Sequence, residues 1–203
     1  MVERLLVVLK FIFAVLLLPL VVGTVVALQS EIMKLDPLLQ QAINIGTLAY
    51  VLMKFFVYDF DAVYKFGQGL VGGCFQFLKP VMNFAPYVFP IYTILGIIAY
   101  AIFNAAGKMG EHGELGPVFF TVIAFTFAMH IVLTAQDLYT KDSMAGKPDY
   151  FFAMALIFIV DVFLMAMLMS LAGKGFSFVN FFKSLSAASC DMYVGIFRQL
   201  FVK

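Results

Sequence analysis

The chain has few charged residues and no tryptophan. Asp, Glu, Lys and Arg together make up 12% of its 203 residues, and the net charge at neutral pH is +1. A soluble domain has about a quarter of its residues charged, so this chain lacks the residues for an ordinary water-exposed surface. The small net charge argues against nucleic acid as a partner, because binding to phosphates needs a strongly basic surface.

Cysteine and catalytic motifs are equally scarce. Cys74 and Cys190 lie far apart and in no CxxC arrangement, so they form neither a disulfide framework nor a metal site. No HExxH, GxSxG or Walker sequence is present. His112 lies between Glu111 and Glu114 in a glycine-rich stretch that we expect to be a solvated loop. The sequence therefore predicts a protein that is not an enzyme and binds no metal or cofactor.

Apolar residues are abundant instead. They make up 64% of the sequence, with 25 phenylalanines, and the mean hydropathy is +1.01. This excess is too large to be hidden inside one soluble globule, so much of it must face lipid. The sequence therefore predicts an all-α fold, a polytopic transmembrane helical bundle, with the lipid bilayer around it.

Long apolar runs give the expected membrane spans. A bilayer core about 30 Å thick is crossed by about 20 apolar residues in a helix. The runs that meet or approach this length are 5–28, 38–58, 89–106, 117–135 and 150–172. The first run is too long for a typical secretory signal, and we expect it to be retained as a span.

A further segment, 62–80, leaves two alternatives open. Gly69 and Gly73 have the GxxxG spacing that lets transmembrane helices pack closely, but the glycines of this segment also suit a broken or interfacial segment. If it crosses, the chain has six spans, and Lys and Arg are more numerous on the side of the two termini. If it does not, there are five spans and almost no bias. The positive-inside rule favours both termini in the cytoplasm, and we expect a bacterial inner membrane.

The last part of the chain has a different pattern. Residues 1–175 are expected to form a single transmembrane helical domain, whereas in 176–203 apolar residues from Phe178 to Leu200 recur at spacings of three, four or seven. That spacing predicts an amphipathic helix. Its apolar face would rest at the membrane interface or against a partner, and the pattern does not decide between these two alternatives.

One carboxylate lies in the middle of the last apolar run. Asp161 is the only polar residue between Ile157 and Leu168, and a lone charge at this depth costs about 3 kcal/mol. The preceding run offers His130. Because a loop that begins near Thr140 joins the two runs, both side chains lie about 15 Å from it on antiparallel helices. We predict a pair of His130 and Asp161, with Asp137 two turns along the same helix face. The pair is either a proton or ion relay or a polar clamp that fixes helix register.

One helical hairpin resembles a known family. The stretch from Tyr92 to Phe125 has a glycine-containing helix with an Ala-Tyr pair, a short loop with Lys, His and Gly-Pro, and a second apolar helix. It resembles the hairpins of small polytopic inner-membrane components of type IV secretion and conjugation systems. The resemblance covers this hairpin alone. It implies a structural subunit of an envelope complex and brings no catalytic residue with it.

Almost nothing of the chain is left for a soluble domain. The sequence therefore favours a non-enzymatic integral membrane subunit of a larger multi-protein membrane assembly, for secretion or transport. Its partners would be the lipid bilayer and either other membrane protein subunits or further copies of the chain. The alternative hypothesis is a small proton- or ion-coupled channel or transporter that uses His130 and Asp161.

Overall fold

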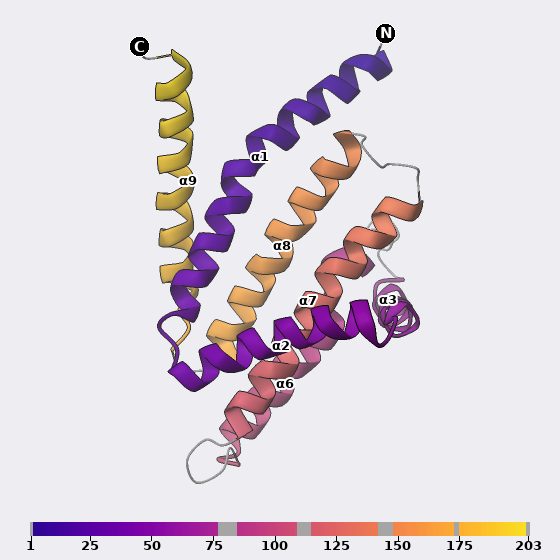
Figure 1. Cartoon of the computed structure of the whole chain (residues 1–203), viewed down its shortest axis with the longest axis vertical. Helices are drawn as coiled ribbons and strands as arrows, with labels where there is room; N and C mark the ends of the chain where they lie inside the picture. The colour runs from indigo at the N-terminus through magenta and orange to yellow at the C-terminus, as the bar shows by residue number, and fades with distance from the viewer. Residues whose placement is uncertain (1, 77–84, 109–114, 142–147, 173–174, 202–203) are drawn as a thin grey trace.

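The computed structural model describes residues 2–76, 85–108, 115–141, 148–172 and 175–201. Within these ranges the regular secondary structure is entirely helical, which confirms the predicted all-α class. The helices are α1 (Val2–Ile32), α2 (Pro37–Phe56), α3 (Asp61–Cys74), α5 (Ala85–Val88), α6 (Ile91–Ala105), α7 (Leu115–Lys141), α8 (Pro148–Ala172) and α9 (Phe178–Phe201), as Figure 1 shows. His112 and its neighbours Glu111 and Glu114 lie outside the described residues.

Three helices are long and apolar enough to cross a membrane. They are Val8–Ile32 of α1, Leu115–Thr140 of α7 and Tyr150–Ala172 of α8. Each coincides with one of the predicted runs, and α8 lies between α1 and α7 (Figure 1). These helices fit the expected integral membrane protein.

The predicted count of five or six spans is not confirmed. Helices α2 and α3, in the runs 38–58 and 62–80, are bent by 119° at a short break, so together they make at most one broken span or a re-entrant loop. The run 89–106 contains α6, whose 15 residues extend over about 22 Å, less than the bilayer core. The described residues therefore offer three spans, or up to four if the bent pair counts as one. Hydropathy alone does not register the bend between α2 and α3 or the start of α6 only at Ile91.

Helix α2 begins at a well-defined cap and packs against α7. The Asp36 side chain accepts a hydrogen bond from the Leu38 N–H at 2.8 Å, and Pro37 suits the first helical turn. Further along, Gly46 lies so close to α7 that an added Cβ would collide with the carbonyl oxygen of Thr121. The absence of a side chain at Gly46 therefore sets the distance between α2 and α7.

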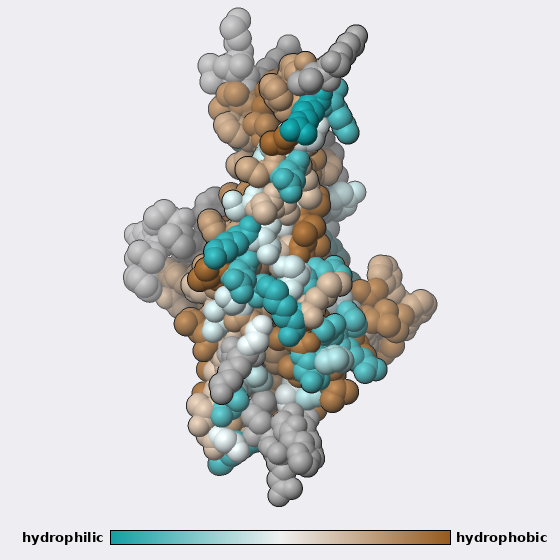
Figure 2. All heavy atoms as spheres, turned by 90° about the vertical axis from the view of Figure 1, so that its left-hand side faces the viewer, coloured by the Kyte–Doolittle hydropathy of each residue, from teal (hydrophilic) through white to brown (hydrophobic). Residues whose placement is uncertain are grey.

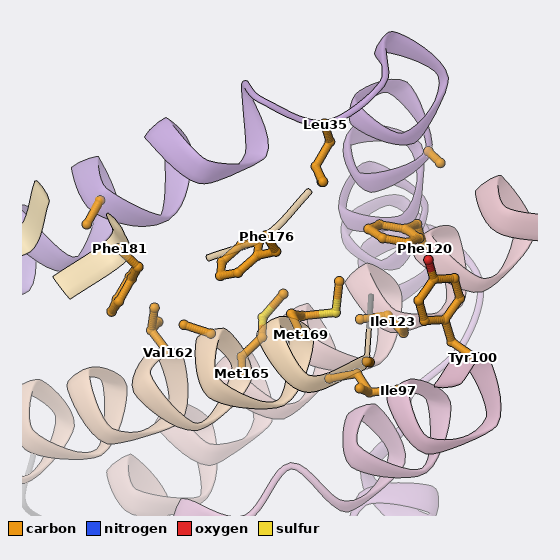
Figure 3. Packing of buried hydrophobic residues seen from close by; sticks show 14 of the residues in the cluster. Leu35, Ile97, Tyr100, Phe120, Ile123, Val162, Met165, Met169, Phe176 and Phe181 are labelled. Carbon is orange, nitrogen blue, oxygen red and sulfur yellow. The ribbon is translucent and has the colours of Figure 1, made fainter. Parts of the chain in front are cut away.

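The hydrophobic core lies where α6, α7, α8 and the beginning of α9 meet the end of α1 (Figure 3). Phe176 and Phe181, around the start of α9, belong to the same buried cluster as Val162 and Met165 of α8. The first turns of α9 are thus anchored in the core of the bundle.

Helix α9 then follows α1 in the opposite direction (Figure 1). An added Cβ at Gly23 would collide with the side chain of Ser189, which shows how closely the two helices approach. Nearer the chain termini, the Tyr193 hydroxyl donates a hydrogen bond to the Leu16 carbonyl. Figure 2, viewed from the side of α9, shows a band of hydrophilic residues running down this side between hydrophobic ones.

Candidate functional site

One face of α7 carries polar side chains into the interior. Thr126, His130, Thr134 and Asp137 follow one another at spacings of four, four and three residues, which places them on one side of a helix. The exposed fractions of His130, Thr134 and Asp137 are 5%, 0% and 9%. Helix α7 therefore brings a row of polar groups into an otherwise apolar bundle.

The structure brings His130 and Asp161 together. The Nε2 atom of His130 on α7 lies 3.4 Å from Oδ2 of Asp161 on α8, and the Asp161 side chain is 0% exposed. Neither carboxylate oxygen of Asp161 has a hydrogen-bond partner in the described part of the chain. The contact with His130 is therefore not a well-formed hydrogen bond, and it is an ion pair only when the imidazole is protonated.

The same imidazole nitrogen faces a second acceptor. His130 Nε2 lies 3.0 Å from the carbonyl oxygen of Tyr87 in α5. Because a carbonyl oxygen only accepts hydrogen bonds, Nε2 carries the hydrogen. That hydrogen is directed to the Tyr87 carbonyl, with the Asp161 carboxylate close by.

The buried pair has one proton to share. An ionised carboxylate alone in such a site would cost several kcal/mol, so Asp161 is either protonated beside a neutral His130 or ionised beside a protonated His130. Both forms have no net charge and contain the same number of protons. Transfer of one proton between the side chains converts one form into the other without a change in the buried charge.

Helix α3 adds a second polar group next to this pair. The Tyr64 hydroxyl lies 2.8 Å from Oγ1 of Thr134, and Nε2 of Gln68 donates to the same hydroxyl at 2.8 Å. The ring centroids of Tyr64 and His130 are 6.0 Å apart. Sequence reasoning missed Tyr64 and Gln68, because no local pattern shows that α3 lies against α7. The sequence shows only that Tyr64 and Gln68 are four residues apart and therefore lie on one face of a helix.

Asp137 lies on the same face of α7, beyond Thr134. It interacts electrostatically with Tyr64, and the Thr140 hydroxyl donates to its backbone carbonyl at 3.1 Å. The three residues singled out in the sequence, His130, Asp161 and Asp137, thus belong to one polar cluster. We define this polar cluster as Tyr64, Gln68, His130, Thr134, Asp137 and Asp161.

A small cavity adjoins the polar cluster. Its lining includes Tyr64, Gln68, Thr126 and His130, and it admits the centre of a water molecule over about 10 Å³. That is room for about one water molecule, which would find several polar partners there. The cavity is thus the place where His130 and the Tyr64–Gln68 pair border a common space.

Gly69 and Gly73 do not make a helix contact within the described part of the chain. A Cβ added at either would meet no atom within 4 Å. The glycine of α3 that does permit a close approach is Gly67, where an added Cβ would lie 2.7 Å from the Tyr92 ring. Packing through Gly69 and Gly73 against another chain stays a prediction.

A second buried carboxylate, also missed in the sequence, lies at the end of α1. The Glu31 side chain is 0% exposed and forms an ion pair with Lys34. Its Oε2 accepts a hydrogen bond from the Ser177 N–H at 3.0 Å. This contact holds the start of α9 against the end of α1, and we regard it as structural.

The donor set of the polar cluster suits proton exchange. Among the described residues, no three His, Cys, Asp or Glu side chains come together in a way that could hold a metal ion. The cluster offers instead one imidazole, two carboxylates, two hydroxyls and an amide in a mostly dry setting. These groups are able to bind, donate and pass protons.

Comparisons of the chain with protein-family models, curated proteins and solved structures found no match. The resemblance of Tyr92–Phe125 to components of type IV secretion systems therefore stays a prediction.

Proposed function

We propose that this protein is a non-enzymatic integral membrane subunit of a larger multi-protein assembly. The observation that supports this is the position of α9, an amphipathic helix that lies along the apolar helix α1. The proposal extends to a role in secretion or transport, in line with the resemblance of the Tyr92–Phe125 hairpin.

Helix α9 exposes charged and amide side chains among apolar ones such as Val179, Phe182 and Phe197. Asn180, Lys183, Asp191 and Arg198 are all exposed. The partner of α9 within the chain is α1, whose segment Val8–Ile32 is apolar enough to span a membrane. Exposed charged side chains therefore lie on a helix that packs along a segment apolar enough to span a membrane.

Contact with lipid is unfavourable for the exposed charged side chains of α9. A charged side chain in the bilayer core costs about 3 kcal/mol on the insertion scale. Lys183 and Arg198 have long stems and are able to reach the headgroups, whereas the short side chain of Asp191 is not. A protein surface with complementary polar groups removes this cost, and this is why we propose a partner subunit or a further copy of the chain on α9.

The orientation proposed for the chain is both termini in the cytoplasm of a bacterium, with the spans in the inner membrane. One observation supports it: the two termini lie at the same end of the molecule (Figure 1). Protease protection of terminal tags in closed membrane vesicles tests this orientation.

Site-specific crosslinking tests the subunit proposal. A photoreactive amino acid at Asp191, on the outer face of α9, is expected to form adducts with protein in intact membranes. The matched control is Leu48 on α2, 58% exposed, which is expected to react with lipid. Lipid adducts at both positions, together with a monomer of 22.6 kDa in mild detergent, would contradict the proposal.

A second candidate function is a small proton- or ion-coupled channel or transporter. The 3.4 Å contact of His130 with Asp161, between two of the membrane-spanning helices, favours it. In proteoliposomes, Asp161→Asn is expected to abolish flux of protons or sodium. Unchanged flux would exclude the relay, and loss of assembly without any effect on flux would identify the pair as a clamp.

A further inference from the structure

We infer that the species handled by the polar cluster is the proton, and that its path leads from His130 and Asp161 to the hydroxyls of Tyr64 and Thr134. This inference rests on the second candidate function and specifies its substrate. It also adds two residues for which the sequence gave no functional role.

The first step of the path is the His130–Asp161 pair. Both side chains are buried, at 5% and 0% exposure, and Nε2 lies 3.4 Å from Oδ2. In the form with a protonated His130 and an ionised Asp161, Nε2 gives its proton to the carboxylate. The imidazole is then neutral with its hydrogen on Nδ1, and Asp161 is a neutral acid. Only N–H and O–H bonds change, and the pair has no net charge before or after the transfer.

The second step is the small cavity. His130, Tyr64 and Gln68 all line it, and it has room for about one water molecule. Water in that position exchanges protons with the imidazole on one side and with a neighbouring hydroxyl on the other. Water in the cavity thus connects His130 with Tyr64, whose ring centroids are 6.0 Å apart.

The third step is the pair of hydroxyls. The 2.8 Å contact of the Tyr64 hydroxyl with Thr134 Oγ1 joins two groups that both donate and accept, which is what a chain of proton transfers requires. Gln68 holds the Tyr64 hydroxyl from its other side at 2.8 Å. Asp137, further along α7 and interacting electrostatically with Tyr64, is the next proton acceptor.

The titratable groups around His130 come from five helices. They are Tyr64 of α3, Tyr87 of α5, Asp137 of α7 and Asp161 of α8, and Tyr92 of α6 lines the same cavity. Within the described residues, the charged side chain that contacts Asp161 is His130, and neither lysine nor arginine does so. The pair therefore has no fixed positive charge beside it that would hold Asp161 permanently ionised.

A metal cation fits this site poorly. Sodium or potassium would have to pass either with its water shell or with several oxygen ligands in its place, and the cavity admits about one water molecule. Within the described residues, no group of three acidic, His or Cys side chains could replace the lost water. A proton needs neither, because it moves along hydrogen bonds between fixed groups.

The test uses the full chain in liposomes that contain a pH-sensitive dye, with a potassium gradient and valinomycin to set the membrane potential. A parallel set with a sodium-sensitive dye measures sodium. The variants are Asp161→Asn, Tyr64→Phe and Thr134→Val, which keep side-chain shape but remove the proton-exchanging group. The matched control is Tyr100→Phe, another buried tyrosine, which lies on α6 outside the polar cluster. Thermal unfolding in detergent confirms that each variant is folded.

The inference requires proton flux in the unmodified chain, no sodium flux, and a loss of at least about tenfold in all three cluster variants but not in Tyr100→Phe. If only Asp161→Asn loses flux, the relay stands but the path through Tyr64 and Thr134 is wrong. Sodium flux without proton flux leaves an ion-coupled function and overturns the inference. If the chain conducts neither ion, both the second candidate function and this inference are wrong. If Tyr64→Phe does not fold, Thr134→Val alone decides between these outcomes.

Discussion

Glu31 at the end of α1 and Ser177 just before α9 are joined by a hydrogen bond of 3.0 Å, although they lie 146 residues apart in the chain. The Glu31 side chain is 0% exposed, so water does not compete for this contact. Close by, Gly175 has a positive φ of 107°, and an added Cβ there would lie 3.3 Å from Leu35. One carboxylate and one tight turn therefore fix the place where α9 starts along α1.

Replacement of Glu31 by alanine is expected to loosen α9. The Ser177 N–H would lose its acceptor in a partly buried place, which costs about 1–3 kcal/mol. Glu31→Gln is the matched variant, because the amide oxygen still accepts from Ser177, and we expect it to lose clearly less stability. Thermal unfolding in detergent and a cysteine crosslink between Leu16 and Tyr193 measure the two effects. Equal losses in both variants would mean that the charge, and not the hydrogen bond, matters here.

Gly46 and Gly69 are expected to respond in opposite ways to alanine. At Gly46 the added methyl group collides with the Thr121 carbonyl of α7, and overpacking of this kind costs about 1–3 kcal/mol. At Gly69 the methyl group meets no atom within 4 Å, and alanine favours a helix by up to about 1 kcal/mol. Thermal unfolding of the two variants in one detergent tests this contrast.

The Gly69 variant also tests packing between chains. Size-exclusion chromatography that shows a smaller complex for Gly69→Ala, at unchanged stability, would support the predicted GxxxG contact with another chain. A Gly69→Ala variant that unfolds as early as Gly46→Ala would contradict the placement of α3.

Apolar runs predict the long helices of this chain well and their arrangement poorly. α1, α7 and α8 lie where 5–28, 117–135 and 150–172 were expected, because about 20 consecutive apolar residues have few alternatives to a spanning helix. The bend between α2 and α3 was missed, because the polar residues near Asp59 and Asp61 look the same in a wet loop and at a 119° turn. α6 starts only at Ile91, after Pro90, and that start shortens it.

Only some residues of the candidate site could be predicted from the sequence. Asp161 and His130 were identifiable because a polar residue in an apolar run is conspicuous and two helices joined by a short loop have comparable depths. Tyr64 and Gln68 were not, since α3 reaches α7 through contacts between segments about 70 residues apart, as in the Tyr64–Thr134 pair. Glu31 was missed because its partner Ser177 is even more distant in sequence, at 146 residues.

His130→Gln and Asp161→Asn are expected to differ in their effect on stability. Asp161→Asn leaves a neutral His130 that still donates to the Tyr87 carbonyl, whereas His130→Gln leaves Asp161 buried without the imidazole. The histidine variant should therefore be the less stable one, and the double variant should regain part of the loss. Coupling energies between contacting groups are about 0.5–3 kcal/mol. Unfolding of all four chains in detergent gives this energy, and strictly additive losses would mean that the two side chains do not interact.

Charge reversals on α9 are expected to affect assembly but not the fold. Lys183 and Asp191 are exposed on the outer face, so Lys183→Glu and Asp191→Lys change no buried contact within the chain and should alter its stability by less than about 0.5 kcal/mol. If a polar partner surface covers α9, like charges would then face each other, and the complex in mild detergent should dissociate. Lys108, exposed after α6, provides the control: Lys108→Glu changes the charge in the same way as Lys183→Glu. Blue native electrophoresis of the three variants measures the outcome, and a complex that survives both reversals would show that the partner does not bind at α9.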